Sequence, residues 1–135
     1  ISWIKATDWN EEASDILRHK NTMPHSVKDR IDILRTTELN VSPTHGLYFD
    51  KEFSLEPFMD EAIKSPIYEA EDYQGVRDVL AVIHDRSIIS KFLKNLKPQK
   101  VILADGHHRM EGSIMYRKEM LVKMLKIDGE EGAAR

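Results

Sequence analysis

Apolar positions along the chain occur in short runs that alternate with stretches of helical spacing. This pattern predicts strands interleaved with helices. We expect strands at residues 1–6, 46–49, 76–84 and 100–104. We expect helices at residues 11–18, 27–39, 55–63, 86–96 and 107 to about 126. Their order predicts an α/β or α+β fold, with a mixed sheet flanked by helices.

Residues with capping or turn propensity separate these elements. Asn10 and Ser26 are candidate N-caps of the first two helices, because their short polar side chains can accept from free backbone N–H groups. Residues 69–75 are predicted to form an acidic loop closed by Gly75, and residues 129–132 a flexible exit.

Composition limits the classes of function that fit this sequence. The chain has 135 residues, 41% hydrophobic and 32% charged, which is typical of one globular domain spanning residues 1–135. It contains no cysteine, which excludes disulfides, cysteine zinc sites and thiol catalysis. The net charge of -3 disfavours a dedicated nucleic-acid binder. No apolar run approaches membrane-spanning length, so we expect no membrane partner.

The first residues read like the interior of a strand, and no initiator Met or signal peptide precedes them. We therefore expect the central portion of a longer, cytoplasmic protein. Charge is also uneven along the chain. Residues 50–78 carry nine acids and three bases, whereas residues 97–126 carry seven bases and three acids. The basic excess reflects either ordinary surface variation or a local anion site.

The segment 104–109 carries the clearest chemical signal, because its polar residues directly follow a predicted buried strand. Gly106 permits a tight turn into a helix whose first N–H groups and positive dipole end attract anions. His108 and Arg109 add donors suited to phosphate, and Asp105 and His107 add acid–base groups. The alternative is a capping Asp105 followed by exposed histidines. A weaker alternative is a metal site at Asp105 and Glu111, since Glu111 shares a helix face with either histidine.

A second polar cluster lies at residues 18–30, between the first two predicted helices. A loop at this place can reach a cleft, so His19, Thr22 and Arg30 are candidate substrate-binding residues. The alternative is a solvated connection between helices.

Three blocks of sequence resemble the bacterial and archaeal family known as domain of unknown function 1015. Residues 104–117 resemble its ADGHHRYEAA…YR signature, residues 19–30 its HEKT-x-P…DR segment, and residues 42–50 its SP…LY-D strand. The sequence departs from the family pattern at Lys20, Met110 and Gly112–Ser113. The corner at 104–109 is also similar to that of the ParB/sulfiredoxin-like superfamily, which implies a phosphate-binding corner and, by analogy with some members, phosphorylation of free serine.

The resemblance favours a nucleotide-dependent small-molecule kinase that uses ATP or ADP with Mg²⁺ and acts on a substrate such as free L-serine. In this interpretation Asp105, His107 and His108 are catalytic, and Gly106, His108 and Arg109 bind phosphate. The alternative is a non-catalytic sensor that binds a nucleotide or an amino acid at the same corner. A nuclease-like activity is a third hypothesis, which the acidic net charge disfavours.

Overall fold

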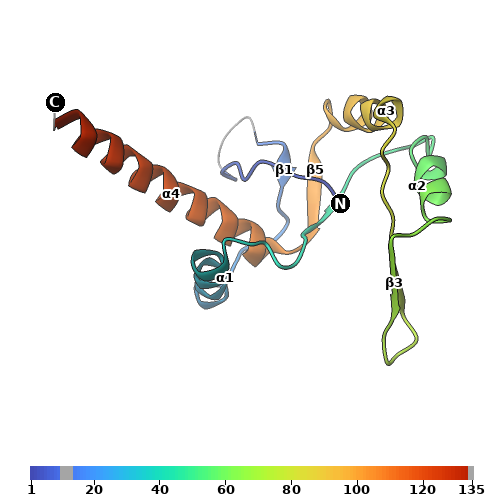
Figure 1. The fold of residues 1–135 in the computed structure, drawn as a ribbon, viewed down its shortest axis with the longest axis horizontal. Coiled ribbons are helices and arrows are strands. Elements are labelled where there is room, and N and C mark those ends of the chain that lie inside the picture. The colour runs from blue at the N-terminus through green and yellow to red at the C-terminus, as the bar shows by residue number, and fades with distance from the viewer. Residues whose placement is uncertain (10–13, 134–135) are drawn as a thin grey trace. The chain divides into compact units, whose positions relative to one another are not determined.

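A computed structural model describes the backbone of residues 1–9 and 14–133, with side chains up to residue 125. The chain divides into two compact units, Ile1–Leu47 with Lys100–Arg135, and Tyr48–Gln99. The described elements of the first unit (Figure 1) are β1 (Ile16–Leu17), α1 (Pro24–Thr37), β2 (His45–Leu47), β5 (Val101–Asp105) and α4 (His107–Ala133).

The first unit is built on a three-stranded mixed sheet in the order β1–β5–β2. β5 runs parallel to β1, with Ile16 opposite Val101, and antiparallel to β2, with Gly46 opposite Leu103. The prediction of a central strand near residues 100–104 and of a mixed α/β fold is confirmed.

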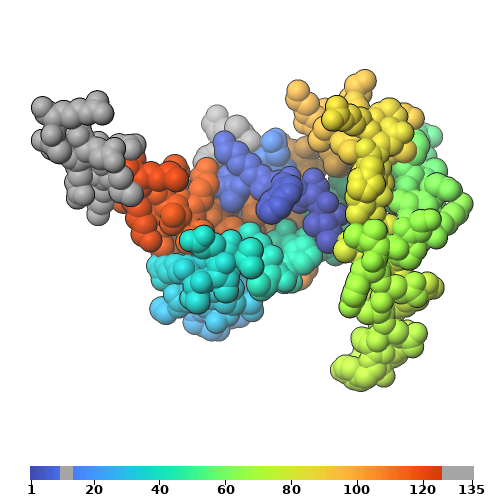
Figure 2. Space-filling view, in the orientation of Figure 1, coloured from blue at the N-terminus to red at the C-terminus, as the bar shows by residue number. Residues whose placement is uncertain are grey.

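The core of this unit forms where the sheet meets the first turns of α4. Buried Ile16 and Leu103 from the sheet pack with Met110 and Ile114 from α4, and half-buried Trp9 covers their edge. α1 turns a second apolar stripe inward, made of Val27, Ile31 and Leu34. Figure 2 shows α1 packed directly against the described part of α4.

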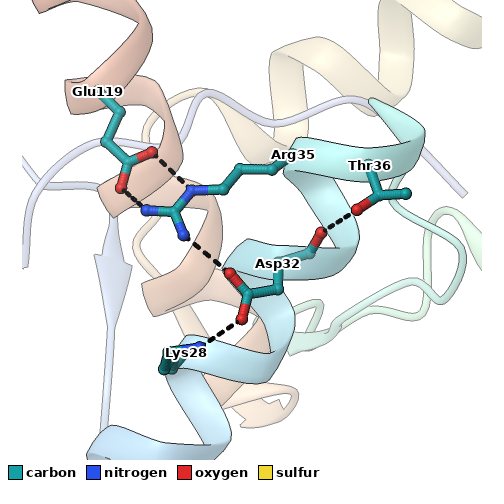
Figure 3. Close-up of polar contacts among 5 residues, drawn as sticks. All are labelled: Lys28, Asp32, Arg35, Thr36 and Glu119. Atoms are coloured by element: carbon teal, nitrogen blue, oxygen red, sulfur yellow. Dashed lines mark hydrogen bonds and ion pairs between the residues drawn. The ribbon is translucent and has the colours of Figure 1, made fainter.

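A polar network also ties α1 to α4 at the surface (Figure 3). Arg35 donates through Nε and Nη2 to both carboxylate oxygens of Glu119, at 3.0 and 2.6 Å. Its Nη1 donates to Asp32, which Lys28 approaches from the previous turn at 2.7 Å. The fork of Arg35 therefore joins the two helices at the surface through a bidentate ion pair.

The second unit contains α2 (Glu56–Ala62), the hairpin strands β3 (Tyr68–Glu71) and β4 (Arg77–Leu80), and α3 (Arg86–Leu96). Asp85 caps α3 by accepting from the backbone N–H groups of Ser87 and Ile88. The hairpin turn closes at Gly75, whose φ of 81° suits glycine.

Several expected elements were correct. α3 has the predicted bounds, and α2, β2 and β5 agree with prediction to within about two residues. α1 begins at Pro24, so the predicted N-cap Ser26 lies inside the helix. Proline is tolerated at the first position because the N–H that it lacks would have no helical partner.

Two predictions near the N-terminus were wrong. Residues 1–6 form no strand, because no described strand pairs with them, and the side chains of Ile1 and Trp3 are exposed. The described part of the predicted helix at 11–18, residues 14–18, contains a strand and no helix. Ile16–Leu17 form β1, and the N–H of Val101 donates to the carbonyl of Asp15. The predicted cap Asn10 and residues 11–13 lie outside the described residues.

Two further predictions were wrong in the second unit and at the C-terminus. The acidic stretch 69–75 contributes β3 rather than only a loop, and it pairs with β4. The predicted buried strand 76–84 is shortened to β4, whose four residues are all exposed, because a two-stranded hairpin has little to cover its faces. The predicted exit at 129–132 continues α4, which ends at Ala133.

Among the described residues, no helix is both long and apolar enough to cross a membrane.

Candidate functional site

The site begins at the turn between β5 and α4, which the sequence predicted. Gly106 has a φ of 91°, a conformation that side chains disfavour. A Cβ atom there would lie 2.8 Å from the methyl group of Thr44, so the position is closed to larger residues by contact as well. The N–H of Met110 makes the first helical bond, to the Gly106 carbonyl. The N–H groups of residues 107–109 therefore have no partner within the helix.

The loop after β1 lies against this turn. β1 and β5 are parallel neighbours, so their carboxyl ends meet at the same edge of the sheet. The imidazole of His19 contacts that of His107 edge to face, with ring centroids 4.5 Å apart. Of the predicted site residues, His19 is thus brought directly to the β5–α4 corner.

His107 is the most unusual side chain of the corner. It is only 1% exposed, and neither Nδ1 nor Nε2 has a hydrogen-bond partner in the described part of the chain. Burial, and then the electrostatic effects of the neighbouring His19 and Lys20, lower the pKa of His107 below its ordinary 6.5. The ring is therefore neutral at pH 7, with one donor and one acceptor unused. Nε2 of neighbouring His108 is also buried without a partner in this part of the chain.

Asp105 carries an ionised carboxylate beside the helix N-terminus. A hydrogen bond from the Gly106 N–H, followed by the positive charges of Arg109 and Lys20, holds the pKa of Asp105 below its ordinary value, against the opposing effect of desolvation. The side chain is 67% exposed and accepts from Nη2 of Arg109 at 2.5 Å. It is accessible to a ligand, although part of its charge is already matched.

Arg109, a predicted phosphate-binding residue, makes several contacts within the protein. Besides Asp105, its guanidinium donates to the Ser42 hydroxyl at 2.6 Å and to the Pro43 carbonyl. The side chain is 23% exposed. These bonds fasten the segment before β2 to the first turn of α4.

The other predicted substrate-binding residues lie farther along the chain. Arg30 projects from α1 beside Gly112, and with Arg109 it lines a cavity of about 20 Å³, which holds roughly one water molecule. Arg30 forms an ion pair with Asp29, at 3.6 Å. Thr22 is half-buried in the loop that leads to α1.

The predicted metal ligands do not share a site in the described structure. The carboxylate of Glu111 accepts a hydrogen bond from the indole N–H of Trp9, whereas Asp105 bonds to Arg109. No group of three or more potential ligands lies together among the described residues. The donor set therefore fits a protein-held metal ion poorly.

Sequence reasoning assigned no role to Trp9 or Lys20, and it placed Arg18 only within a polar cluster. The guanidinium carbon of Arg18 lies 5.5 Å from the centre of the Trp9 ring. Arg18, His19 and Lys20 line an open hollow at the end of β1. The one signal for this in the sequence was a basic run directly after the short apolar pair Ile16–Leu17.

Comparison with protein families gave a match over residues 1–134 to the family described as "Protein of unknown function (DUF1015)". No curated protein and no solved structure matched the chain.

Proposed function

The chain belongs to the DUF1015 family of proteins of unknown function, and we propose that it is a nucleotide-dependent phosphotransferase acting on a small hydroxyl-bearing molecule. Free L-serine is the candidate substrate, and ATP or ADP the candidate phosphate donor. The observation that carries the proposal is the buried imidazole of His107, which lies at the first position of α4 and has a partner for neither nitrogen among the described residues. Buried polar groups normally have partners, so an unpaired one at a helix N-terminus points to a ligand that supplies them.

The residues of the corner suit a phosphate group in several ways. The free N–H groups at positions 107–109 and the positive end of α4 attract an anion. Lys20 adds positive charge, which contributes to lowering the pKa values of both Asp105 and His107. His19, whose ring contacts that of His107 edge to face, adds a second imidazole to the corner.

The chemistry asked of the protein is mainly positioning, because the transferred phosphoryl group passes through a loose transition state. The substrate hydroxyl oxygen attacks phosphorus, the bond from phosphorus to the nucleotide oxygen breaks, and the hydroxyl proton moves to Asp105. Asp105 is ionised at neutral pH and can accept that proton, and its lowered pKa makes it a weak base, which suits the late proton transfer of a loose transition state. Because the described carboxylates fit a metal cage poorly, no step is assigned to Mg²⁺.

One observation favours the second candidate, a sensor that binds without turnover. The carboxylates of Asp105 and Glu111 both already have hydrogen-bond partners within the protein. A sensor needs only the anion site, whereas a kinase also needs a carboxylate that can reach the substrate hydroxyl.

The test is to incubate the protein with L-serine and ATP or ADP, with Mg²⁺ in the buffer, and to follow O-phosphoserine by ³¹P NMR. Formation of O-phosphoserine that is lost in Gly106→Val supports the kinase. Nucleotide binding by calorimetry without product supports the sensor. If neither nucleotide nor inorganic phosphate binds the folded protein, the corner is not an anion site.

A further inference from the structure

Arg18 is a cation at the end of β1 whose N–H groups bond to none of the described residues. Its guanidinium carbon lies over the Trp9 ring in a cation–π contact, and the side chain is exposed. It makes no hydrogen bond or ion pair with any residue of the described chain. Arg109, by contrast, already bonds to Ser42, Pro43 and Asp105. The cation–π contact restrains the guanidinium while no described residue occupies its N–H edge, and this state is suited to binding an anion.

The platform beneath Arg18 is itself held by α4. Trp9 is half-buried against the core of the first unit, and its indole N–H donates to the carboxylate of Glu111. Glu111 follows His107 by four residues, which places it on the same face of α4, about 6 Å along the axis. His19 therefore contacts the first turn of α4 at His107, and Arg18 is linked to the next turn through Trp9 and Glu111.

We infer that Arg18 binds a second phosphoryl group of the ligand, and that Trp9 and Glu111 are positioning residues that hold Arg18 for this contact. The inference rests on the proposed phosphate site at the β5–α4 corner. One phosphoryl group occupies the free N–H groups of α4. Arg18, which is linked to α4 one turn beyond His107, contacts the next phosphoryl group along the ligand. The ligand class is a diphosphate, as in the phosphate chain of a nucleoside di- or triphosphate.

The inference predicts selectivity between two small probes, inorganic pyrophosphate and inorganic phosphate. Calorimetry on the whole chain gives the ratio of the two affinities. We expect Arg18→Ala to weaken pyrophosphate binding about tenfold and phosphate binding less than about twofold, because one charge-assisted hydrogen-bonding group is lost. Lys123→Ala is the matched control, since it removes one exposed positive charge about 24 Å farther along α4. This distance of about 24 Å is counted along α4 from His107. We expect Lys123→Ala to leave the ratio of the two affinities unchanged.

Variants of the platform test the positioning roles. We expect Trp9→Leu and Glu111→Ala to lower the ratio about threefold, because Arg18 loses its restraint. Glu111→Gln keeps an acceptor for the indole N–H and restores the ratio. Partial unfolding lowers both affinities alike, so the ratio reports on positioning rather than on stability.

Two results would overturn these claims, and they are distinguishable. If the wild-type protein binds both probes and Arg18→Ala leaves the ratio unchanged, the role of Arg18 is wrong while the phosphate site stands. If the folded wild-type protein binds neither probe, the phosphate site fails, and the inference fails with it.

Discussion

His107 is a buried polar side chain without a described hydrogen-bond partner, and such a group lowers the stability of the fold. An unpaired buried polar group costs about 1–3 kcal/mol, and an apolar residue of similar shape avoids that cost. We therefore expect His107→Leu to leave Tm unchanged or raise it, while phosphate binding is lost. Thermal unfolding and calorimetry on the same variant measure both effects. A clear fall in Tm with binding intact would make His107 a packing residue.

The same side chain predicts a dependence of stability on pH. The pKa of His107 is lowered from its ordinary 6.5, so between the two values the unfolded chain binds more protons than the folded chain. This difference costs no stability above about pH 6.5, where the ring is neutral in both states, and it destabilises the fold increasingly as the pH falls toward the folded pKa. We expect Tm to fall between about pH 7 and pH 5.5, and to fall less in His107→Leu. Parallel curves for the two proteins would contradict the lowered pKa.

The contacts of Arg109 change the expected effect of its removal on the stability of the fold. A ligand-facing arginine would leave the stability of the free protein unchanged on removal. Its bonds to Ser42, Pro43 and Asp105 instead predict that Arg109→Ala destabilises the fold by roughly 1–3 kcal/mol. Arg109→Lys recovers part of this, because it keeps the charge but not the fork. An unchanged Tm with weakened phosphate binding would instead support direct contact with the ligand.

The sequence predicted the residues of the corner better than their partners. Gly106 and the two histidines stood out because a turn residue and polar groups directly followed a buried strand. The contacts of Arg109 with Ser42 and of Trp9 with Glu111 could not be predicted in this way. Ser42 lies 67 residues from Arg109, and Glu111 lies 102 residues from Trp9. Only the fold determines which side chains meet over such separations.

At the scale of elements, local signals predicted helices better than strands. α3 matched its expected bounds because Asp85 caps it and Pro98 follows it within two residues of its end. β1 has two residues, and it exists because β5 pairs with it rather than because of its own propensity. β3 was missed because its sequence, Tyr-Glu-Ala-Glu, is acidic and its strand character depends on pairing with β4.

The crossing of α1 and α4 depends on Gly112, a role that the spacing of apolar residues did not indicate. A Cβ atom at this position would lie 2.9 Å from the Cβ of Arg30, a contact that requires the helices to shift apart. Gly112→Ala gains up to about 1 kcal/mol of helix propensity but loses roughly 1–3 kcal/mol through overpacking.

We therefore expect a net destabilisation of about 1 kcal/mol for Gly112→Ala, measured by denaturant unfolding. Met115→Ala is the control, because this exposed residue lies on the same helix and changes propensity little. If Gly112→Ala is more stable than the wild type, the two helices can separate without cost.

At the scale of the whole molecule, the candidate site and the buried core concentrate in the first unit. Every residue assigned to the phosphate site lies within residues 1–47 or 100–135. In the second unit, Leu55 is the one described apolar side chain that is fully buried, whereas Tyr68 and Leu93 are more than 60% exposed. Opening of backbone hydrogen bonds is easier where few apolar contacts hold them, so the two units should differ in amide exchange.

This division predicts where a bound anion alters exchange. With saturating pyrophosphate, we expect slower hydrogen exchange in peptides covering residues 14–21 and 101–112, because the ligand joins the ends of β1 and β5 to the first turn of α4. Peptides from residues 48–99 should exchange as before, since no assigned contact lies there. His107→Leu with pyrophosphate is the control and should show no change anywhere. Protection confined to residues 48–99 would place the anion site in the second unit and remove the corner from consideration.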